Sequence, residues 1–78
     1  MNEFIESNHC VICRFQHKNW ISLGYLNKRN NRFYLIDNDD HGSYRIEQDK
    51  IFIKWDHWPQ ETFIKKHISD KEYYYEHI

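Results

Sequence analysis

The stretch from Trp55 to Glu61 carries the densest chemistry in the chain, because two indole rings stand beside two acids and an imidazole. Indole faces stack on the rings of bases and sugars, and Asp56, His57 or Glu61 could hydrogen-bond to the polar edge of such a ring. The same aromatic corner fits a partner protein, because tryptophan is enriched among the residues that dominate binding energy. A structural interpretation is also open, in which Trp55 lies in the core and Trp58 plugs the open end of a barrel.

A second group of potential ligands runs from His9 to His17, with Cys10 and Cys13 between the two histidines. Thiolates and imidazoles at this spacing can supply tetrahedral ligands to zinc. The residues between the cysteines are valine and isoleucine, which favour a strand over the tight turn of a zinc site. A strand points residues three apart to opposite faces, so we expect no metal and no disulfide at these cysteines.

The acidic loop from Asp37 to Gly42 has the opening spacing of a calcium loop, with acids at the first and third positions and glycine at the sixth. Its fifth position is His41, and its twelfth is Gln48 instead of a bidentate glutamate. The flanking segments alternate like strands, whereas a calcium loop lies between helices. We therefore interpret this segment as an exposed polar loop and assign no metal to it.

Two short basic segments could contact phosphate, one at residues 28–32 and one at residues 65–67. If the fold places both on one face with aromatic side chains between them, a nucleotide phosphate or a single strand could bind there. A solvated surface is the alternative, since acids balance the bases elsewhere in the chain. The basic residues are Lys28, Arg29, Arg32, Lys65, Lys66 and His67, and the aromatic candidates are Trp20, Tyr25 and Tyr34.

Alternating apolar and polar residues predict the strands that must position these groups. Residues 43–47 and 51–55 alternate with a period of two around a turn at residues 48–50, so we expect them to pair as an antiparallel hairpin. The pattern G-x-Y-x-I from Gly42, followed by I-x-I-x-W from Ile51, resembles the strand pairs of lipocalin-like and other meander β-domains. This resemblance implies a fold, and it carries over no function and no site residues.

The rest of the chain predicts further short strands separated by turns. Gly24 lies inside one of them and indicates a bend, and Pro59 cannot donate to a ladder and so predicts a corner. An asparagine in the left-handed region is expected in the turn at residues 28–31. The expected strands span residues 10–15, 20–26 and 32–36, the last of these central and apolar on both faces, with a strand or short helix at 62–68 and an edge strand at 71–78.

Five to six short antiparallel strands predict an all-β fold, a small curled antiparallel meander or barrel. The single domain covers residues 1–78, with residues 1–8 as a flexible lead. We also expect a homo-oligomer, because a chain of this size leaves apolar surface and a strand edge that a monomer covers poorly.

Composition restricts the protein further, with a formal net charge of −1 and 18% aromatic residues in 78. The balanced charge gives no field that would attract a nucleic acid polymer. No segment has the length of a membrane span or the pattern of a signal peptide, so we expect a cytoplasmic protein without membrane contact. Abundant asparagine, lysine, isoleucine and tyrosine, with no alanine, indicate an AT-rich genome such as that of a phage or large virus.

We therefore expect a non-catalytic binding module for a small polar ligand that bears a ring, either a nucleotide or a sugar, with no cofactor. The alternative is a virally encoded inhibitor or counter-defence protein that binds a host protein through the same aromatic corner. A metal-dependent or histidine-dependent hydrolase is a third hypothesis. A concave pocket favours the first, a flat apolar patch the second and a bound metal the third. The residues assigned to the ligand are Trp55, Trp58 and Tyr34 for stacking, with Asp56, His57 and Arg32 for its polar parts.

Overall fold

The computed structural model describes residues 5–6, 9–37 and 40–78. These residues form eight β-strands and no helix, so none of them belongs to a helix long and apolar enough to cross a membrane. The expected all-β class is therefore confirmed, whereas the expected count of five to six strands is too low. The strands are β1 (Ile5–Glu6), β2 (Cys10–Gln16), β3 (Ile21–Asn27), β4 (Arg32–Leu35), β5 (His41–Glu47), β6 (Lys50–Trp55), β7 (Glu61–His67) and β8 (Tyr73–His77).

Strands β2 to β8 close into a barrel. Each strand pairs in antiparallel fashion with the next one along the chain, and β8 then returns to pair with β2. Counted from β2, β8 is the seventh strand, so it runs in the same direction as β2 and the closing pair is parallel, with Phe15 opposite Tyr75. The expected edge strand at residues 71–78 was wrong for this reason, because β8 is paired on both sides.

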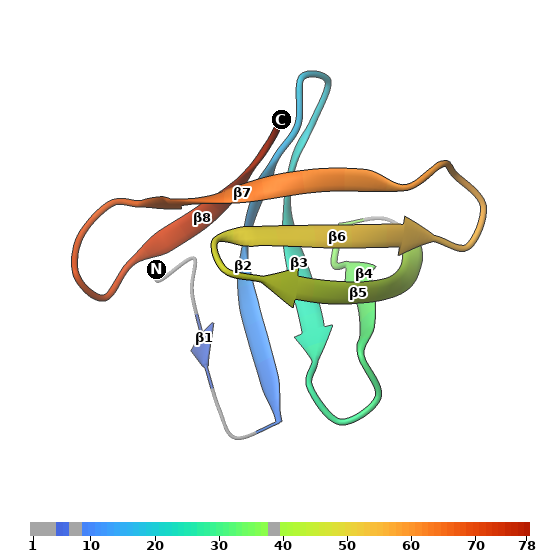
Figure 1. Cartoon of the computed structure of the whole chain (residues 1–78), viewed down its shortest axis with the longest axis horizontal. Coiled ribbons are helices and arrows are strands. Elements are labelled where there is room, and N and C mark those ends of the chain that lie inside the picture. The colour runs from blue at the N-terminus through green and yellow to red at the C-terminus, as the bar shows by residue number, and fades with distance from the viewer. Residues whose placement is uncertain (1–4, 7–8, 38–39) are drawn as a thin grey trace.

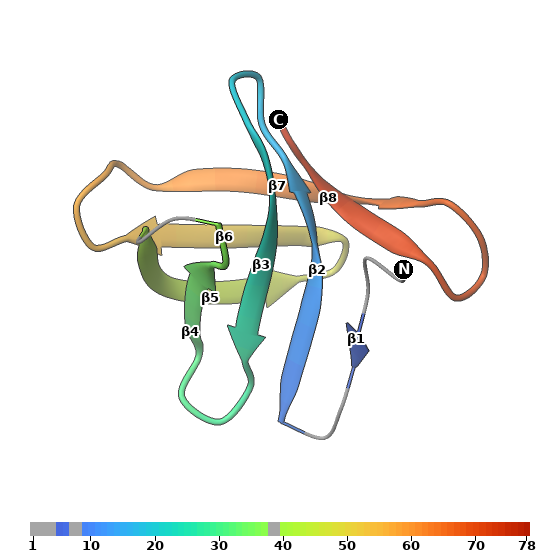
Figure 2. The same ribbon diagram turned by 180° about the vertical axis from the view of Figure 1, so that it is seen from behind.

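The barrel is strongly curled. Figure 1 shows β5, β6 and β7 crossing β2 and β3 at a steep angle, and Figure 2 shows the same crossing from behind. Such a crossing is typical of a sheet that folds over and packs on itself orthogonally. The pleat then sends alternate side chains of each strand into the interior and the others to the outer surface.

The hairpin expected at residues 43–55 is confirmed, with Tyr44 opposite Ile53 and Glu47 opposite Lys50. Its turn is shorter than expected, because Lys50 already belongs to β6. Residues 61–67 form a strand and not a helix. The turn after β3 contains Asn31 with a φ of 57°, the left-handed conformation expected of an asparagine there.

Aromatic rings fill the middle of the barrel around Phe15. Its ring centroid lies 5.0 Å from that of Phe33, 5.4 Å from that of Phe63 and 5.1 Å from that of Tyr75. Gly24 makes this packing possible, because a Cβ there would come within 2.6 Å of the Phe15 and Phe33 rings. We expected a bend at this glycine, and the structure gives it a packing role, in a strand whose register with β2 is unbroken.

Strand β4 is central, as expected, because it lies between β3 and β5. Its inner face is buried through Phe33 and Leu35. Its outer face is not covered, however, and Tyr34 and the following Ile36 are both exposed.

Connections between strands collect at the two ends of the barrel, because successive strands run in opposite directions. We call one of them the tryptophan end, and the other the tyrosine end. Among the described residues, the tryptophan end holds the connections at residues 17–20, 36–37, 40 and 56–60, and the tyrosine end holds those at 28–31, 48–49 and 68–72.

Candidate ligand-binding site

A cavity of about 500 Å³ opens at the tryptophan end. Ligand pockets span about 300 to 1,000 Å³, so this cavity is large enough for a small molecule. All three tryptophans of the chain line it, namely Trp20, Trp55 and Trp58. The other lining residues are His17, Asn19, Asp40, Pro59 and Glu61.

Glu61, the first residue of β7, is the polar centre of this cavity. Its Oε1 accepts a hydrogen bond from Nε1 of Trp55 at 2.8 Å. Its Oε2 lies 2.8 Å from Nε2 of His17 and 2.9 Å from Nε2 of His77. These partners come from the end of β6, the turn after β2 and the end of β8. Strands β6 and β8 pair directly with β7, and closure of the barrel adds His17.

The far nitrogen of each imidazole indicates where its proton lies. The backbone N–H of Asn19 donates to Nδ1 of His17 at 3.2 Å, so the proton of the neutral ring sits on Nε2. Nδ1 of His77 is buried without a hydrogen-bond partner among the described residues, and a bare lone pair is less costly there than an unpaired N–H. Both rings therefore donate Nε2–H to Glu61, which accepts three hydrogen bonds as a carboxylate.

A metal ion is the other chemistry that His17, Glu61 and His77 could support, since their ligand atoms lie within 4.8 Å of one another. A neutral histidine that binds a metal through Nε2 carries its proton on Nδ1 and donates it to a second partner. In His17 that proton would face the N–H of Asn19, and in His77 it would find no acceptor in the described part of the chain. These surroundings fit a hydrogen-bonded carboxylate better than a metal centre.

Trp58 presents its ring to solvent at the rim of the cavity. The side chain is 61% exposed, although its Nε1 donates to Oδ1 of Asp40 at 3.1 Å. The alternative interpretation of Trp58 as a plug is therefore wrong, because a plug would be buried. Trp55 is 6% exposed and belongs to the core, as that interpretation required. Trp20 stacks on His17 with ring centroids 5.0 Å apart and completes the aromatic wall.

Arg32 and Asp56, which we expected to contact the ligand, pair with each other on the outer surface. Arg32 donates from Nη2 to Oδ2 of Asp56 at 2.7 Å and from Nη1 to Oδ1 at 3.3 Å. Nδ1 of His41 lies 2.6 Å from the same Oδ2. These hydrogen bonds, first of all the one from Arg32, lower the pKa of Asp56 from 3.8 to about 2.

Tyr34 and His57 also lie away from the lining of the cavity. Tyr34 stacks on Tyr25, with ring centroids 4.9 Å apart, and its ring is exposed. The ring of His57 is 6.0 Å from that of His41. Of the predicted site residues, Trp55 and Trp58 line the cavity, whereas Arg32, Tyr34, Asp56 and His57 do not.

His77 is the member of this site that the sequence did not indicate. It reaches Glu61 because β8 pairs with β7, with His77 opposite Phe63 and therefore diagonally across from Glu61. Closure of β8 onto β2 brings His17 to the same carboxylate, and an odd number of strands in a closed meander would have been the signal for it, since it requires a parallel closing pair. His17 was considered as a zinc ligand beside the cysteines, and the structure turns it towards Glu61.

The two other motifs have separate outcomes. Strand β2 directs Cys10 and Cys13 to opposite faces, as expected, with Cys13 buried and no disulfide between them. In the acidic loop, Asn38 and Asp39 lie outside the described residues, and Asp37 accepts a hydrogen bond from the hydroxyl of Ser22 at 3.1 Å.

Comparison with known proteins gives no match, because no family model, no curated protein and no solved structure is similar enough to this chain to assign it to a family.

Proposed function

We propose that this protein is a non-catalytic binding module whose tryptophan end holds a small polar ligand with a ring, and that the ring is a sugar. The observation that carries this proposal is the cavity itself, which is lined by an exposed indole and by a hydrogen-bonded carboxylate. A concave site of this kind suits a small molecule, whereas a protein interface would be expected to use a flat apolar patch.

The indole of Trp58 offers a stacking surface that is already in position. Its hydrogen bond to Asp40 fixes the direction of the ring, so little side-chain freedom is lost when a ligand binds. Stacking of a base on an aromatic side chain contributes about 1 to 3 kcal/mol, and the apolar face of a sugar ring can use the same surface.

The polar lining favours hydroxyl groups over phosphate. Asp40 and Glu61 supply carboxylates, and no lysine or arginine is among the described residues that line the cavity. Hydroxyl groups donate to carboxylates, whereas a phosphate would be repelled by both of them. Oε1 of Glu61 accepts from Trp55 and retains a lone pair for a ligand hydroxyl. Of the two ligands expected from the sequence, the sugar is therefore favoured at this end.

A binding role also fits the histidines. A general base must present a free nitrogen lone pair to the reacting proton. The Nε2 atoms of His17 and His77 both face Glu61, and Nδ1 of His17 is occupied by Asn19. These contacts position Glu61, and the one remaining lone pair, on Nδ1 of His77, is buried, so neither imidazole presents a base to a ligand.

A virally encoded inhibitor of a host protein is the second candidate, and the exposure of Trp58 is the observation that favours it. We further propose that the protein acts in the cytoplasm, since thiols on opposite faces of a strand suit a reducing compartment. Self-association is proposed from the exposed Tyr34 and Ile36, and sedimentation showing only the 9.9 kDa species would remove it.

The test is a titration with methyl glycosides of common monosaccharides, followed at the three indole N–H signals by NMR. We expect saturable shifts that include Trp58, and a loss of affinity of about 1 to 3 kcal/mol in Trp58→Ala with an unchanged melting temperature. Tyr34→Ala is the matched control, because it removes an exposed aromatic ring that does not line the cavity. If no glycoside shifts any indole signal, or if both variants weaken binding equally, the proposal fails.

A further inference from the structure

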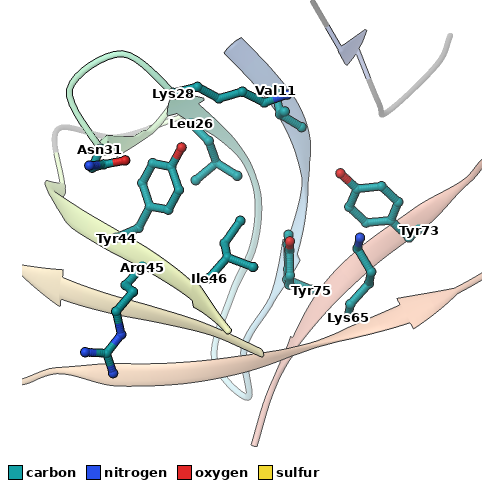
Figure 3. A pocket seen from close by; sticks show the side chains of 10 residues that line it. All are labelled: Val11, Leu26, Lys28, Asn31, Tyr44, Arg45, Ile46, Lys65, Tyr73 and Tyr75. Atoms are coloured by element: carbon teal, nitrogen blue, oxygen red, sulfur yellow. The ribbon is translucent and has the colours of Figure 1, made fainter. Parts of the chain in front are cut away.

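A second cavity, of about 530 Å³, opens at the tyrosine end and shares no lining residue with the first. Figure 3 shows Tyr44 on one side of it, Tyr73 and Lys65 on the other, and Tyr75 between them. The pleat explains the arrangement, since Tyr44 lies on the inner face of β5 and Tyr73 and Tyr75 lie on the inner face of β8.

Two lysines from separate basic segments of the sequence line this cavity. Lys28 belongs to the turn after β3, and Lys65 lies near the end of β7. The ammonium group of Lys65 lies 4.1 Å from the centre of the Tyr73 ring, an attractive contact that holds a positive charge at the wall. Arg45 contributes less, because it points away from the middle of the cavity and lies over the ring of Phe52.

The tyrosines add neutral hydrogen-bond donors to these charges. Burial raises the pKa of Tyr44 and of Tyr75, so both phenols keep their protons near neutral pH and can donate to an anion. Among the described residues, no aspartate or glutamate lines the cavity. The charge of this lining is therefore opposite to that of the tryptophan end.

Ile46 shows that the cavity is open to solvent above an apolar floor. It lies opposite Ile51 and faces the interior of the barrel as Ile51 does. Ile51 is fully buried, whereas Ile46 is 48% exposed, because nothing in the described part of the chain covers it. With Val11 and Leu26 it gives the ring of a ligand an apolar surface to contact.

We propose that the tyrosine end binds a phosphate monoester of a ring-bearing molecule, with the phosphate at Lys28 and Lys65 and the ring against Ile46 and Tyr44. A phosphate monoester carries a charge of about −1.5 to −2 near pH 7 and three strong acceptor oxygens. Two ammonium groups and the phenol donors match that charge and those acceptors. The site does not depend on the sugar proposed for the other end, because the two linings share no residue.

One acid near this cavity should repel the anion. Its removal should strengthen binding, whereas removal of a lysine should weaken it. Asp49 lies in the turn between β5 and β6, and its charge is one of the causes that raise the pKa of Tyr75. Its backbone carbonyl accepts a hydrogen bond from the N–H of Lys65 at 2.6 Å. Removing the carboxylate while keeping the backbone should therefore strengthen phosphate binding.

The experiment is a titration of the full chain with phenyl phosphate, followed by amide-resolved NMR, with inorganic phosphate and phenol as separate probes. We expect saturable shifts at Lys28, Tyr44 and Lys65, tighter binding of phenyl phosphate than of either fragment, and unmoved indole N–H signals. Binding should weaken as salt is raised, because exposed charges are screened.

Matched variants then test whether the charge of Lys65 contributes to phenyl phosphate binding. Lys65→Gln should weaken phenyl phosphate binding about tenfold, because a charge-assisted hydrogen bond is lost. Lys66→Gln removes the same charge one residue away, at an exposed position outside the cavity lining, and should leave affinity unchanged. Lys65→Arg should retain binding, and Asp49→Asn should strengthen it about twofold to threefold.

Three results would overturn the proposal. The absence of saturable shifts at this end on addition of phenyl phosphate would exclude the site. Equal weakening by Lys65→Gln and Lys66→Gln would show that only general surface charge is involved. Equal affinity for inorganic phosphate and phenyl phosphate would remove the ring from the proposed ligand. If Lys65→Gln does not fold, Lys65→Arg and Asp49→Asn carry the same test.

Discussion

The two ends of one small barrel differ in the chemistry that they offer. At the tryptophan end, indole rings surround the carboxylates of Glu61 and Asp40. At the tyrosine end, phenol rings surround the ammonium groups of Lys28 and Lys65. The two cavities are nearly equal in size, at about 500 and 530 Å³, so volume does not distinguish them. The difference lies in the charge of their linings, and it indicates that a fold with a shared core can present two separate recognition surfaces.

The two ends also differ in how their side chains are held. Glu61 receives hydrogen bonds from three side chains and is fixed from several strands at once. The Lys65 ammonium is held by the face of Tyr73, a weaker and less directional contact. We therefore expect substitution of Glu61 to change stability as well as binding, and substitution of Lys65 to change binding alone.

The largest effect should come from the core that both ends share. Phe15→Ala should lower the free energy of unfolding by about 3 to 5 kcal/mol, because a fully buried ring leaves a cavity among Phe33, Phe63 and Tyr75. Urea denaturation measures this change in the free energy of unfolding. Ile21→Ala is the control, since that side chain is exposed and should change stability by less than about 0.5 kcal/mol. A mild effect of Phe15→Ala would mean that the two ends do not depend on one core.

The next effect separates the two ends. Glu61→Ala should destabilise the fold by about 2 to 3 kcal/mol, because the donors of Trp55, His17 and His77 lose their acceptor. Phenyl phosphate binding at the tyrosine end should survive in the folded variant. Glu47→Ala provides the matched control, because that glutamate is exposed and makes only a loose contact with Arg45. Equal melting temperatures for the two variants would contradict a structural role for the Glu61 network.

A smaller effect distinguishes the two tryptophans next to the cavity opening. Trp55→Phe should cost about 1 to 2 kcal/mol, because it shortens a buried side chain and removes the donor to Glu61. The same change at Trp58 should alter stability by less than about 0.5 kcal/mol, since the ring is largely exposed. Thermal melts of both variants decide this, and a Trp58→Phe variant as unstable as Trp55→Phe would restore the interpretation of Trp58 as a plug.

The smallest effect concerns Asp56 on the outer surface. Its pKa is lower in the folded chain, at about 2, than its ordinary value of 3.8, so pairing stabilises the fold above that ordinary value and the contribution disappears as the pH falls towards 2. Melting temperatures of the wild type and Asp56→Asn should therefore differ slightly near neutral pH and converge in strong acid. A difference that grows on acidification would contradict the sign of this shift.

The sequence predicted the positions of the strands much better than their pairing. Alternation at residues 43–47 and 51–55 reports which face of a strand is buried, and this is a local property that the structure confirms. The pairing of β8 with β2 is a long-range property that no local pattern reports, and it brings His17 to Glu61 and His77. Arg32 and Asp56 show another long-range effect, because two polar groups 24 residues apart hydrogen-bond to each other on the outer surface instead of facing the cavity.

The tryptophan corner illustrates the same distinction within a few residues. Trp55 continues the inner face of β6, so its burial followed from the pleat. Trp58 lies in a connection without a repeating pattern, and its indole donates a hydrogen bond to Asp40 in another connection. The position of Trp58 could therefore not be predicted without knowledge of the fold.

The most direct test of the difference between the ends is one NMR titration series in which the same sample receives a methyl glycoside first and phenyl phosphate second. All three indole N–H groups belong to the tryptophan end, so they report that end separately from the amides of Tyr44 and Lys65. We expect the glycoside to shift indole signals only and phenyl phosphate to shift the Tyr44 and Lys65 amides only. Both ligands should be bound at the same time once the titration is complete. Displacement of one ligand by the other, or phenyl phosphate shifts at the indoles, would contradict the assignment of opposite chemistries to the two ends.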